Sequence, residues 1–195
     1  MQEAGTAGTQ PGTGTDTGAW RTRDIVVVAV IAVAFGVFFW AFGFVWSGLA
    51  VLGPLQNVFY GAWLLPAIVA PLIVRKPGAA LFAEVVAAGL SALLGSQWSV
   101  DTLISGVLQG GAAELVFLAF RYRTFSLPVV ALASFAATVA AFVHDWIVYY
   151  ATYDAAALAA IGVFMAISGL VLLPLVAIGL VNALRRSGAL EGFPV

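Results

Sequence analysis

Two acidic side chains lie inside strongly apolar segments and are the first candidates for chemistry. Glu84 stands in AALFAEVVAAG and Glu114 in GGAAELVFLAF. An ionisable group deep in a bilayer costs roughly 2.5–3.5 kcal/mol, so each is a functional-site hypothesis by default. Counted from the nearest cations, Lys76 and Arg121, both carboxyl groups are expected at one depth.

Two neighbouring carboxylates would repel each other unless a cation or several donors lay between them, and a cationic, amine-bearing substrate would satisfy both. The alternative is that one or both are protonated and join helices through hydrogen bonds to backbone or hydroxyl groups.

The Trp and Tyr residues gather in the parts of the apolar segments that are far from the cations. These rings are Trp40, Trp46, Trp63, Trp98, Trp146, Tyr60, Tyr149, Tyr150 and Tyr153, whereas only Trp20 and Tyr122 stand beside cations. An interfacial belt should occupy both membrane surfaces. The imbalance favours a pocket whose rings stack on a flat heterocycle or hold a cation, although a belt role stays open for any single ring.

Polar side chains accompany these rings at the same end of the predicted helices. They are Gln56, Asn57, Gln97, Asp101, His144 and Asp145. A few polar groups in an apolar concavity are typical of a small-molecule site. Consecutive helix residues point about 100° apart, so His144 and Asp145 are not expected to form a dyad, and a solvated helix end would explain them equally well.

The composition identifies the class of protein that positions these residues. The chain is 63% hydrophobic and 9% charged, with a mean hydropathy of +1.06, against about 45–50% and about 25% in soluble domains. It has no cysteine and one histidine, which excludes disulfides, thiolate sites and a multi-histidine metal centre. No metal or cofactor is expected, no nucleic-acid partner is indicated, and no phosphate-binding loop is present, so any energy source that the protein needs must come from elsewhere.

The cations predict the topology, because all eight Lys and Arg residues fall in four pairs. The pairs are Arg21 and Arg23, Arg75 and Lys76, Arg121 and Arg123, and Arg185 and Arg186. Each interval accommodates two crossings of about 20 residues, and loops rich in Lys and Arg are cytoplasmic. The sequence therefore predicts an all-α integral membrane protein, a six-transmembrane-helix bundle with both termini in the cytoplasm.

The expected membrane domain covers residues 21–186, between a disordered Gly/Thr-rich tail at 1–20 and a C-terminal tail at 187–195. Its helices are expected near 24–46, 57–74, 78–94, 102–120, 126–147 and 159–184, with outer loops near 47–56, 95–101 and 149–155. The strip Ala29, Ala32 and Gly36 permits close helix approach, either within the bundle or onto a partner membrane protein.

Three motif strings resemble one known family. YGAW at 60–63, RKPGAAL at 75–81 followed by Glu84, and SGVLQGGAAELVF at 105–117 followed by Arg121 are similar to the YkoE family, which comprises substrate-binding S components of energy-coupling factor (ECF) transporters for thiamine and its hydroxymethylpyrimidine precursor. The resemblance covers at least residues 21–147. It implies a non-enzymatic vitamin-capture subunit in the bacterial plasma membrane, working with a transmembrane T component and two cytoplasmic ATPase subunits.

The resemblance also directs attention to particular residues. Tyr60, Trp63, Glu84 and Glu114 stand on the family's motif strings, and small residues of the first helix would dock the T component, which favours Ala29, Ala32 and Gly36 for that role. For thiamine, we expect Glu84 or Glu114 to bind the aminopyrimidine or balance the positive charge. One of Trp98, Trp63 and Trp146 would stack on a ring. The full set of ligand-binding candidates is Glu84, Glu114, Trp98, Trp63, Tyr60, Gln97, Trp146, His144, Asp145 and Gln56.

Other functions remain open from the residues alone. A stand-alone proton-coupled transporter of a small cationic amine could use Glu84 and Glu114 as a proton relay. An intramembrane enzyme is disfavoured because no nucleophile and base stand out, and an assembly scaffold would bind no ligand. The sequence does not distinguish thiamine from hydroxymethylpyrimidine.

Overall fold

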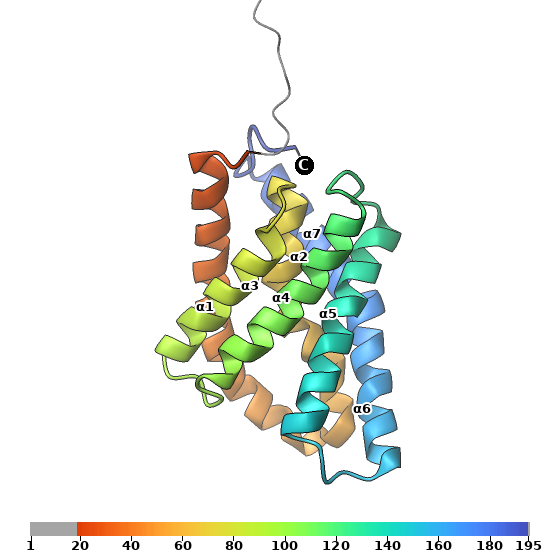
Figure 1. Cartoon of the computed structure of the whole chain (residues 1–195). Helices are drawn as coiled ribbons and strands as arrows, with labels where there is room; N and C mark the ends of the chain where they lie inside the picture. The colour runs from red at the N-terminus through yellow and green to blue at the C-terminus, as the bar shows by residue number, and fades with distance from the viewer. Residues whose placement is uncertain (1–18, 195) are drawn as a thin grey trace, which may run out of the picture.

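The computed structural model describes residues 19–194, and the secondary structure of that part consists of helices joined by short turns, with no strand (Figure 1). Its elements in order are α1 (Thr22–Leu49), η1 (Ala50–Leu64), α2 (Leu65–Val74), α3 (Ala79–Leu93), α4 (Asp101–Ala119), α5 (Leu127–Val148), α6 (Ala155–Ile167), η2 (Ser168–Leu172) and α7 (Leu173–Arg186). The expected N-terminal tail lies mostly outside the described residues. Trp20 is described, and its indole N–H donates to the Pro77 carbonyl over 2.9 Å.

Four helical runs in the described part are long and apolar enough to cross a membrane. They are Thr22–Val74, Asp101–Ala119, Leu127–Val148 and Ala155–Arg186, and Ala79–Leu93 is a shorter apolar helix. The first run has 53 residues, whereas about 20 suffice for one crossing. It changes direction at Gly53, whose φ of 55° belongs to the left-handed region that glycine adopts readily.

The outer loop expected near 47–56 is the clearest difference from the sequence prediction. α1 continues to Leu49, and the 3₁₀ segment η1 begins at Ala50, so the connection is helical on both sides of Gly53. Gly53 and Pro54 supply the turn by themselves. As a result, Gln56, Tyr60 and Trp63 lie on a helical segment rather than partly in a loop.

α2 forms the centre of the bundle, since all ten of its residues are buried. Pro66 lies in its first turn, where a missing backbone N–H costs little. The change from 3₁₀ to α geometry occurs just before it, at Leu64. A second irregularity faces this junction: the π-helical segment η2 turns Ser168 inward, and its hydroxyl accepts the backbone N–H of Gly61 over 2.8 Å.

Glycines set the close packing of α3 against α4. A Cβ at Gly106 would lie 2.7 Å from the Ala88 Cβ, and one at Gly110 would lie 2.8 Å from the Glu84 Cβ. These contacts place Glu84 opposite Gly110 and, one turn along, put Glu114 opposite Ala80. The expectation that the two glutamates share one depth is therefore wrong by about one helical turn, roughly 6 Å, because α4 extends beyond the start of α3.

The cation pairs belong to segments that meet at one end of the bundle. Arg23 donates to the Gly192 carbonyl over 2.6 Å and lies over the Phe193 ring. Arg75 lies over the Phe125 ring, 5.0 Å from its centroid. Figure 1 shows the start of α1 and the C-terminal end of the chain at this same end. The C-terminal segment is packed here rather than free, since Leu190 is buried.

Candidate functional site

A cavity of about 270 Å³ opens at the end of the bundle opposite to the cations. Its lining comes from η1 and from the ends of α1, α4 and α5 that lie far from the cations, together with the middle of α3. The lining residues are Phe39, Trp46, Gln56, Tyr60, Trp63, Glu84, Ala88, Trp98, Asp101, Thr102, Ser105, Gly106, Gln109, Asp145, Tyr149 and Tyr150.

Aromatic rings form one wall of the cavity, with Trp63 at their centre. The Trp63 ring centroid lies 5.3 Å from that of Trp98, 6.1 Å from that of Trp46 and 5.4 Å from that of Phe39. The Trp63–Trp98 pair meets edge to face, at 84°, a favoured arrangement of aromatic pairs. Ring faces presented in this way can stack on a flat ligand or hold a cation.

Glu84 brings a carboxyl group to the cavity from α3. The residue is 1% exposed, and its Oε2 accepts the backbone N–H of Ala67 over 3.0 Å. That amide is in the first turn of α2, where backbone donors have no partner within the helix and the helix dipole favours an anion. The hydrogen bond from Ala67 thus fixes the position of the Glu84 carboxyl group, and Glu84 is one of the residues that line the cavity.

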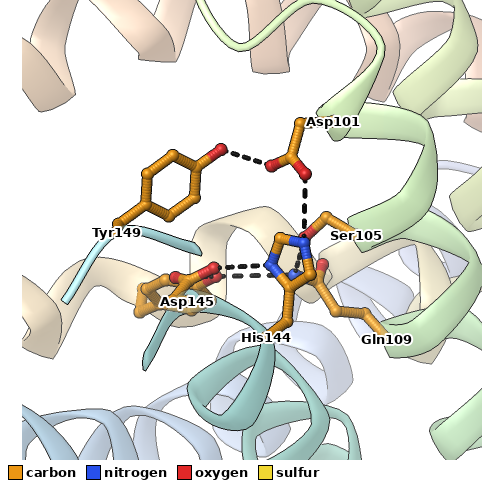
Figure 2. A network of polar contacts seen from close by, with 7 residues as sticks. Asp101, Ser105, Gln109, His144, Asp145 and Tyr149 are labelled. Carbon is orange, nitrogen blue, oxygen red and sulfur yellow. Dashed lines mark hydrogen bonds and ion pairs between the residues drawn. The ribbon is translucent and has the colours of Figure 1, made fainter. Parts of the chain in front are cut away.

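Polar side chains from α4, α5 and η1 form another wall of the cavity, and hydrogen bonds join them (Figure 2). The Tyr60 hydroxyl donates to Asp145 Oδ2 over 2.7 Å. His144 Nδ1 lies 3.0 Å from Asp145 Oδ1, and its Nε2 lies 3.1 Å from Asp101 Oδ1. The Tyr149 hydroxyl donates to the other Asp101 oxygen.

The contacts of His144 and Asp145 decide against one alternative that the sequence left open, a solvated helix end. They are hydrogen-bonded to each other despite being consecutive in a helix, because both side chains reach toward groups beyond the helix: Asp101 for the imidazole and Tyr60 for the carboxylate. They are also not solvated, since the two residues are 7% and 6% exposed.

Two amide side chains complete the lining. Gln109 donates from Nε2 to the Ser105 hydroxyl over 2.6 Å and lies 3.4 Å from the Tyr60 oxygen. Gln56 Oε1 is buried and has no hydrogen-bond partner in the described part of the chain. A buried acceptor without a donor is costly, and a donor on a ligand in the cavity would satisfy this oxygen.

The charge of the cavity is one-sided. Glu84, Asp101 and Asp145 line it, and no Lys or Arg is among its described lining residues. Burial, with Asp101 close by, raises the pKa of Tyr149, and burial together with Asp145 raises the pKa of Tyr150. Both phenols therefore remain neutral donors, and the site suits a ligand with amine donors or a positive charge.

Most of the ligand-binding candidates from the sequence lie in this cavity. Those in its lining are Glu84, Trp98, Trp63, Tyr60, Asp145 and Gln56. His144 lies immediately behind the lining and contacts it through Asp101 and Asp145. Glu114, Gln97 and Trp146 lie elsewhere.

Glu114 joins segments at the end of the bundle where the cation pairs lie, which we call the cation end. Its Oε1 accepts the Gly78 N–H over 2.6 Å, and its Oε2 accepts the Ala80 N–H over 3.1 Å and the Tyr122 hydroxyl over 2.5 Å. Gly78 and Ala80 are at the start of α3, so Glu114 caps that helix. Glu114 joins helices through bonds to backbone and hydroxyl groups, as the alternative from the sequence described, but all three bonds are accepted by its carboxyl oxygens, and it is absent from the cavity lining.

Gln97 and Trp146 both face away from the cavity. Gln97 is exposed and donates to the Gly43 carbonyl over 3.2 Å, which joins the 95–101 turn to α1. Trp146 is 46% exposed and lines a separate, apolar groove between α5 and α6 with Phe142 and Gly162.

Most of the small residues of α1 that the sequence singled out are buried inside the bundle. Ala32 and Gly36 are buried, and a Cβ at Gly36 would lie 2.8 Å from the Leu90 Cβ and 2.9 Å from the Ala87 carbonyl oxygen. Ala29 is half-buried. Packing within the bundle, the alternative left open by the sequence, accounts for Ala32 and Gly36.

Sequence reasoning missed several lining residues, among them Ser105 and Gln109. A signal was available, because Asp101, Ser105 and Gln109 recur every four residues in an otherwise apolar helix and so share one face. Phe39 and Thr102 offered no comparable signal, since apolar and hydroxyl residues are common on every face of these helices.

Three comparisons with known proteins agree on the class of this chain. The family model for the permease component of ABC-type cobalt transport systems matches residues 23–140. The chain is 37% identical over 179 residues to a Bacillus subtilis (strain 168) protein called "Putative HMP/thiamine permease protein YkoE", with 89% of each chain covered. It also resembles a solved S-component of an ECF transporter, with a TM-score of 0.85 and 36% identity over 90% of this chain and 91% of that one.

Proposed function

Because the chain belongs to the YkoE-like S components of ECF transporters, a non-enzymatic class of multi-pass membrane subunits, we propose that its cavity captures thiamine or hydroxymethylpyrimidine. The observation that carries the proposal is the composition of the cavity. Glu84, Asp145, Trp63 and Trp98 line one space together with Gln56, whose Oε1 has no partner among the described residues.

Each group has a counterpart in these ligands. An aminopyrimidine offers N–H donors to a carboxylate or to Gln56 Oε1, and its flat ring can stack on Trp63 or Trp98. The thiazolium of thiamine is a cation, which the carboxylates and ring faces both favour. The cavity volume of about 270 Å³ lies just below the range of roughly 300–1,000 Å³ typical of ligand sites, which favours a small ligand.

We further infer six membrane crossings with both chain termini in the cytoplasm. The bend at Gly53 divides the first helical run into two crossings, and the short helix Ala79–Leu93 would cross as the partner of α4. The cation pairs at one end indicate the cytoplasmic side, so the cavity opens outward. Transport onward would need a T component and two ATPase subunits to supply energy.

The test is direct binding to the purified protein. We expect mass spectrometry to find a pyrimidine-containing vitamin copurifying with the protein, and calorimetry to give saturable binding of thiamine or hydroxymethylpyrimidine. Failure of both compounds to bind would refute the ligand assignment. Uptake by this chain alone, driven by a pH gradient and independent of ATP, would instead favour the proton-coupled transporter.

A further inference from the structure

His144 has an unusual pair of neighbours. Both of its ring nitrogens face carboxylate oxygens, Nδ1 toward Asp145 at 3.0 Å and Nε2 toward Asp101 at 3.1 Å (Figure 2). A neutral imidazole has one N–H donor and one acceptor nitrogen, whereas the imidazolium donates from both. A neutral ring would direct a lone pair at one carboxyl group, so the ring is doubly protonated when both partners are ionised. The alternative with the same distances is a neutral ring that accepts from one protonated aspartic acid.

No Lys or Arg is among the described residues that line the cavity next to the His144 ring. From α4 the ring faces Asp101, and from its own helix it faces Asp145. Tyr149 lies beside it, with ring centroids 6.2 Å apart, and Tyr60 reaches it through Asp145. Glu84 enters the same cavity from α3. Among the described residues of the cavity, an imidazolium would therefore be the one positive charge beside the carboxyl groups of Asp101, Asp145 and Glu84.

We propose that His144 is an imidazolium that sets the charge of the cavity and thereby determines its specificity between cationic and neutral ligands. It holds the oxygens of Asp101 and Asp145 in place and offsets one of their charges. The cavity then attracts a cation less strongly than three bare carboxylates would, and its fixed acceptors remain available to a neutral pyrimidine. This inference rests on the proposed function, because it concerns the same cavity.

The first test compares two ligands that differ in charge. Affinities for thiamine, a permanent cation, and for hydroxymethylpyrimidine are measured by calorimetry at a pH where the free pyrimidine is neutral, in the native protein and in His144→Gln. Removing one positive charge near the ligand should raise the preference for thiamine over hydroxymethylpyrimidine about tenfold. Trp146→Leu, outside the cavity, should leave the preference unchanged.

A purely structural role for His144 predicts a different result. If His144→Gln weakened both ligands by the same factor, or left the preference unchanged, the charge role would be wrong. His144→Asn repeats the removal of charge with a shorter amide and should move the preference in the same direction.

A second measurement needs no variant. The chain has a single histidine, so protein labelled with ¹⁵N-histidine gives the two imidazole nitrogen signals of His144 without assignment. We expect both nitrogens to resonate together as in an imidazolium, in the empty protein at neutral pH. Two widely separated signals, typical of a neutral ring, would overturn the proposal. If neither ligand bound the native protein, the proposed function would fail, while this spectrum would still report the charge of His144.

Discussion

The two glutamates of the apolar helices illustrate how one residue type serves two purposes in one bundle. Glu114, at the cation end, accepts two backbone N–H groups and a tyrosine hydroxyl, all from its own chain. Glu84, about one turn further from that end, accepts one backbone N–H from α2 and lines the cavity. The first carboxyl is used to hold helices together, and the second retains hydrogen-bonding capacity for a ligand.

The difference extends to the residues around each glutamate. At the cation end, Tyr122 and Glu114 satisfy each other and the start of α3. In the cavity, Gln56 Oε1 is buried without a partner among the described residues. What separates the two glutamates is the number of donors from which each accepts a hydrogen bond, three for Glu114 and one for Glu84, since Arg75 Nε at the cation end is also buried without a partner among the described residues.

The largest expected effect among the variants concerns stability at the cation end. Tyr122→Phe removes the hydroxyl that donates to Glu114, and we expect the free energy of unfolding to fall by about 2 kcal/mol, as for hydrogen bonds to charged groups. Thermal unfolding in detergent measures the change. Thiamine affinity should stay the same, and a loss of affinity without a loss of stability would reverse the assignment of the two ends.

Tyr122→Phe should also change how the stability of the protein depends on pH in the alkaline range. Burial, together with Glu114, raises the pKa of Tyr122 above the ordinary tyrosine value of about 10. The folded protein therefore keeps a proton that the unfolded chain loses, so the stability from Tyr122 is present below pH ~10 and is lost as the pH rises. Tyr122→Phe should show a shallower alkaline decline in stability than the native protein.

Next in size is the effect of removing the unpartnered acceptor. Gln56→Leu should weaken ligand binding about tenfold, because a ligand donor loses its partner. The empty protein should become slightly more stable, since a buried unsatisfied oxygen is removed. Gln97→Leu is a matched control outside the cavity and should not change affinity. Equal affinity in Gln56→Leu and the native protein would exclude Gln56 from the site.

The aromatic wall is expected to contribute less for each ring. Trp98→Leu should weaken thiamine binding about fivefold, in line with about 1 kcal/mol for an aromatic contact. The control is Trp40→Leu, because Trp40 packs on Phe44 and is absent from the cavity lining. The same loss of affinity in both variants would indicate a general packing effect.

No effect on affinity is expected for Trp146→Leu. Trp146 lines the apolar groove between α5 and α6 rather than the cavity, although the sequence analysis named it among the rings expected to stack on the ligand. Fluorescence titration or calorimetry with thiamine gives the answer, and a marked loss of affinity would show that the ligand extends beyond this cavity.

The sequence could predict the parts of the molecule that depend on chain order and composition. The cation pairs and the apolar segments between them predicted helices at places where the structure has them, and the aromatic excess far from Arg75 and Arg121 predicted a pocket at that end. These features follow from which residues are neighbours along the chain.

What the sequence could not predict depends on packing between helices. The offset between Glu84 and Glu114 comes from the contacts of Gly106 and Gly110 with α3, which no single segment encodes. The hydrogen bond between His144 and Asp145 depends on the positions of Asp101 and Tyr60 on other elements. The burial of Gly36 against α3 likewise required the folded arrangement.

The division of roles between the two glutamates is tested most directly by one matched pair of variants, Glu84→Gln and Glu114→Gln. Each replaces a carboxylate by an amide of nearly the same shape, and each is measured for thiamine affinity and for thermal unfolding. We expect Glu84→Gln to weaken thiamine binding by about tenfold or more with little change in the unfolding temperature, and Glu114→Gln to lower that temperature with affinity preserved. The opposite pattern, or unchanged thiamine affinity in Glu84→Gln, would contradict the account.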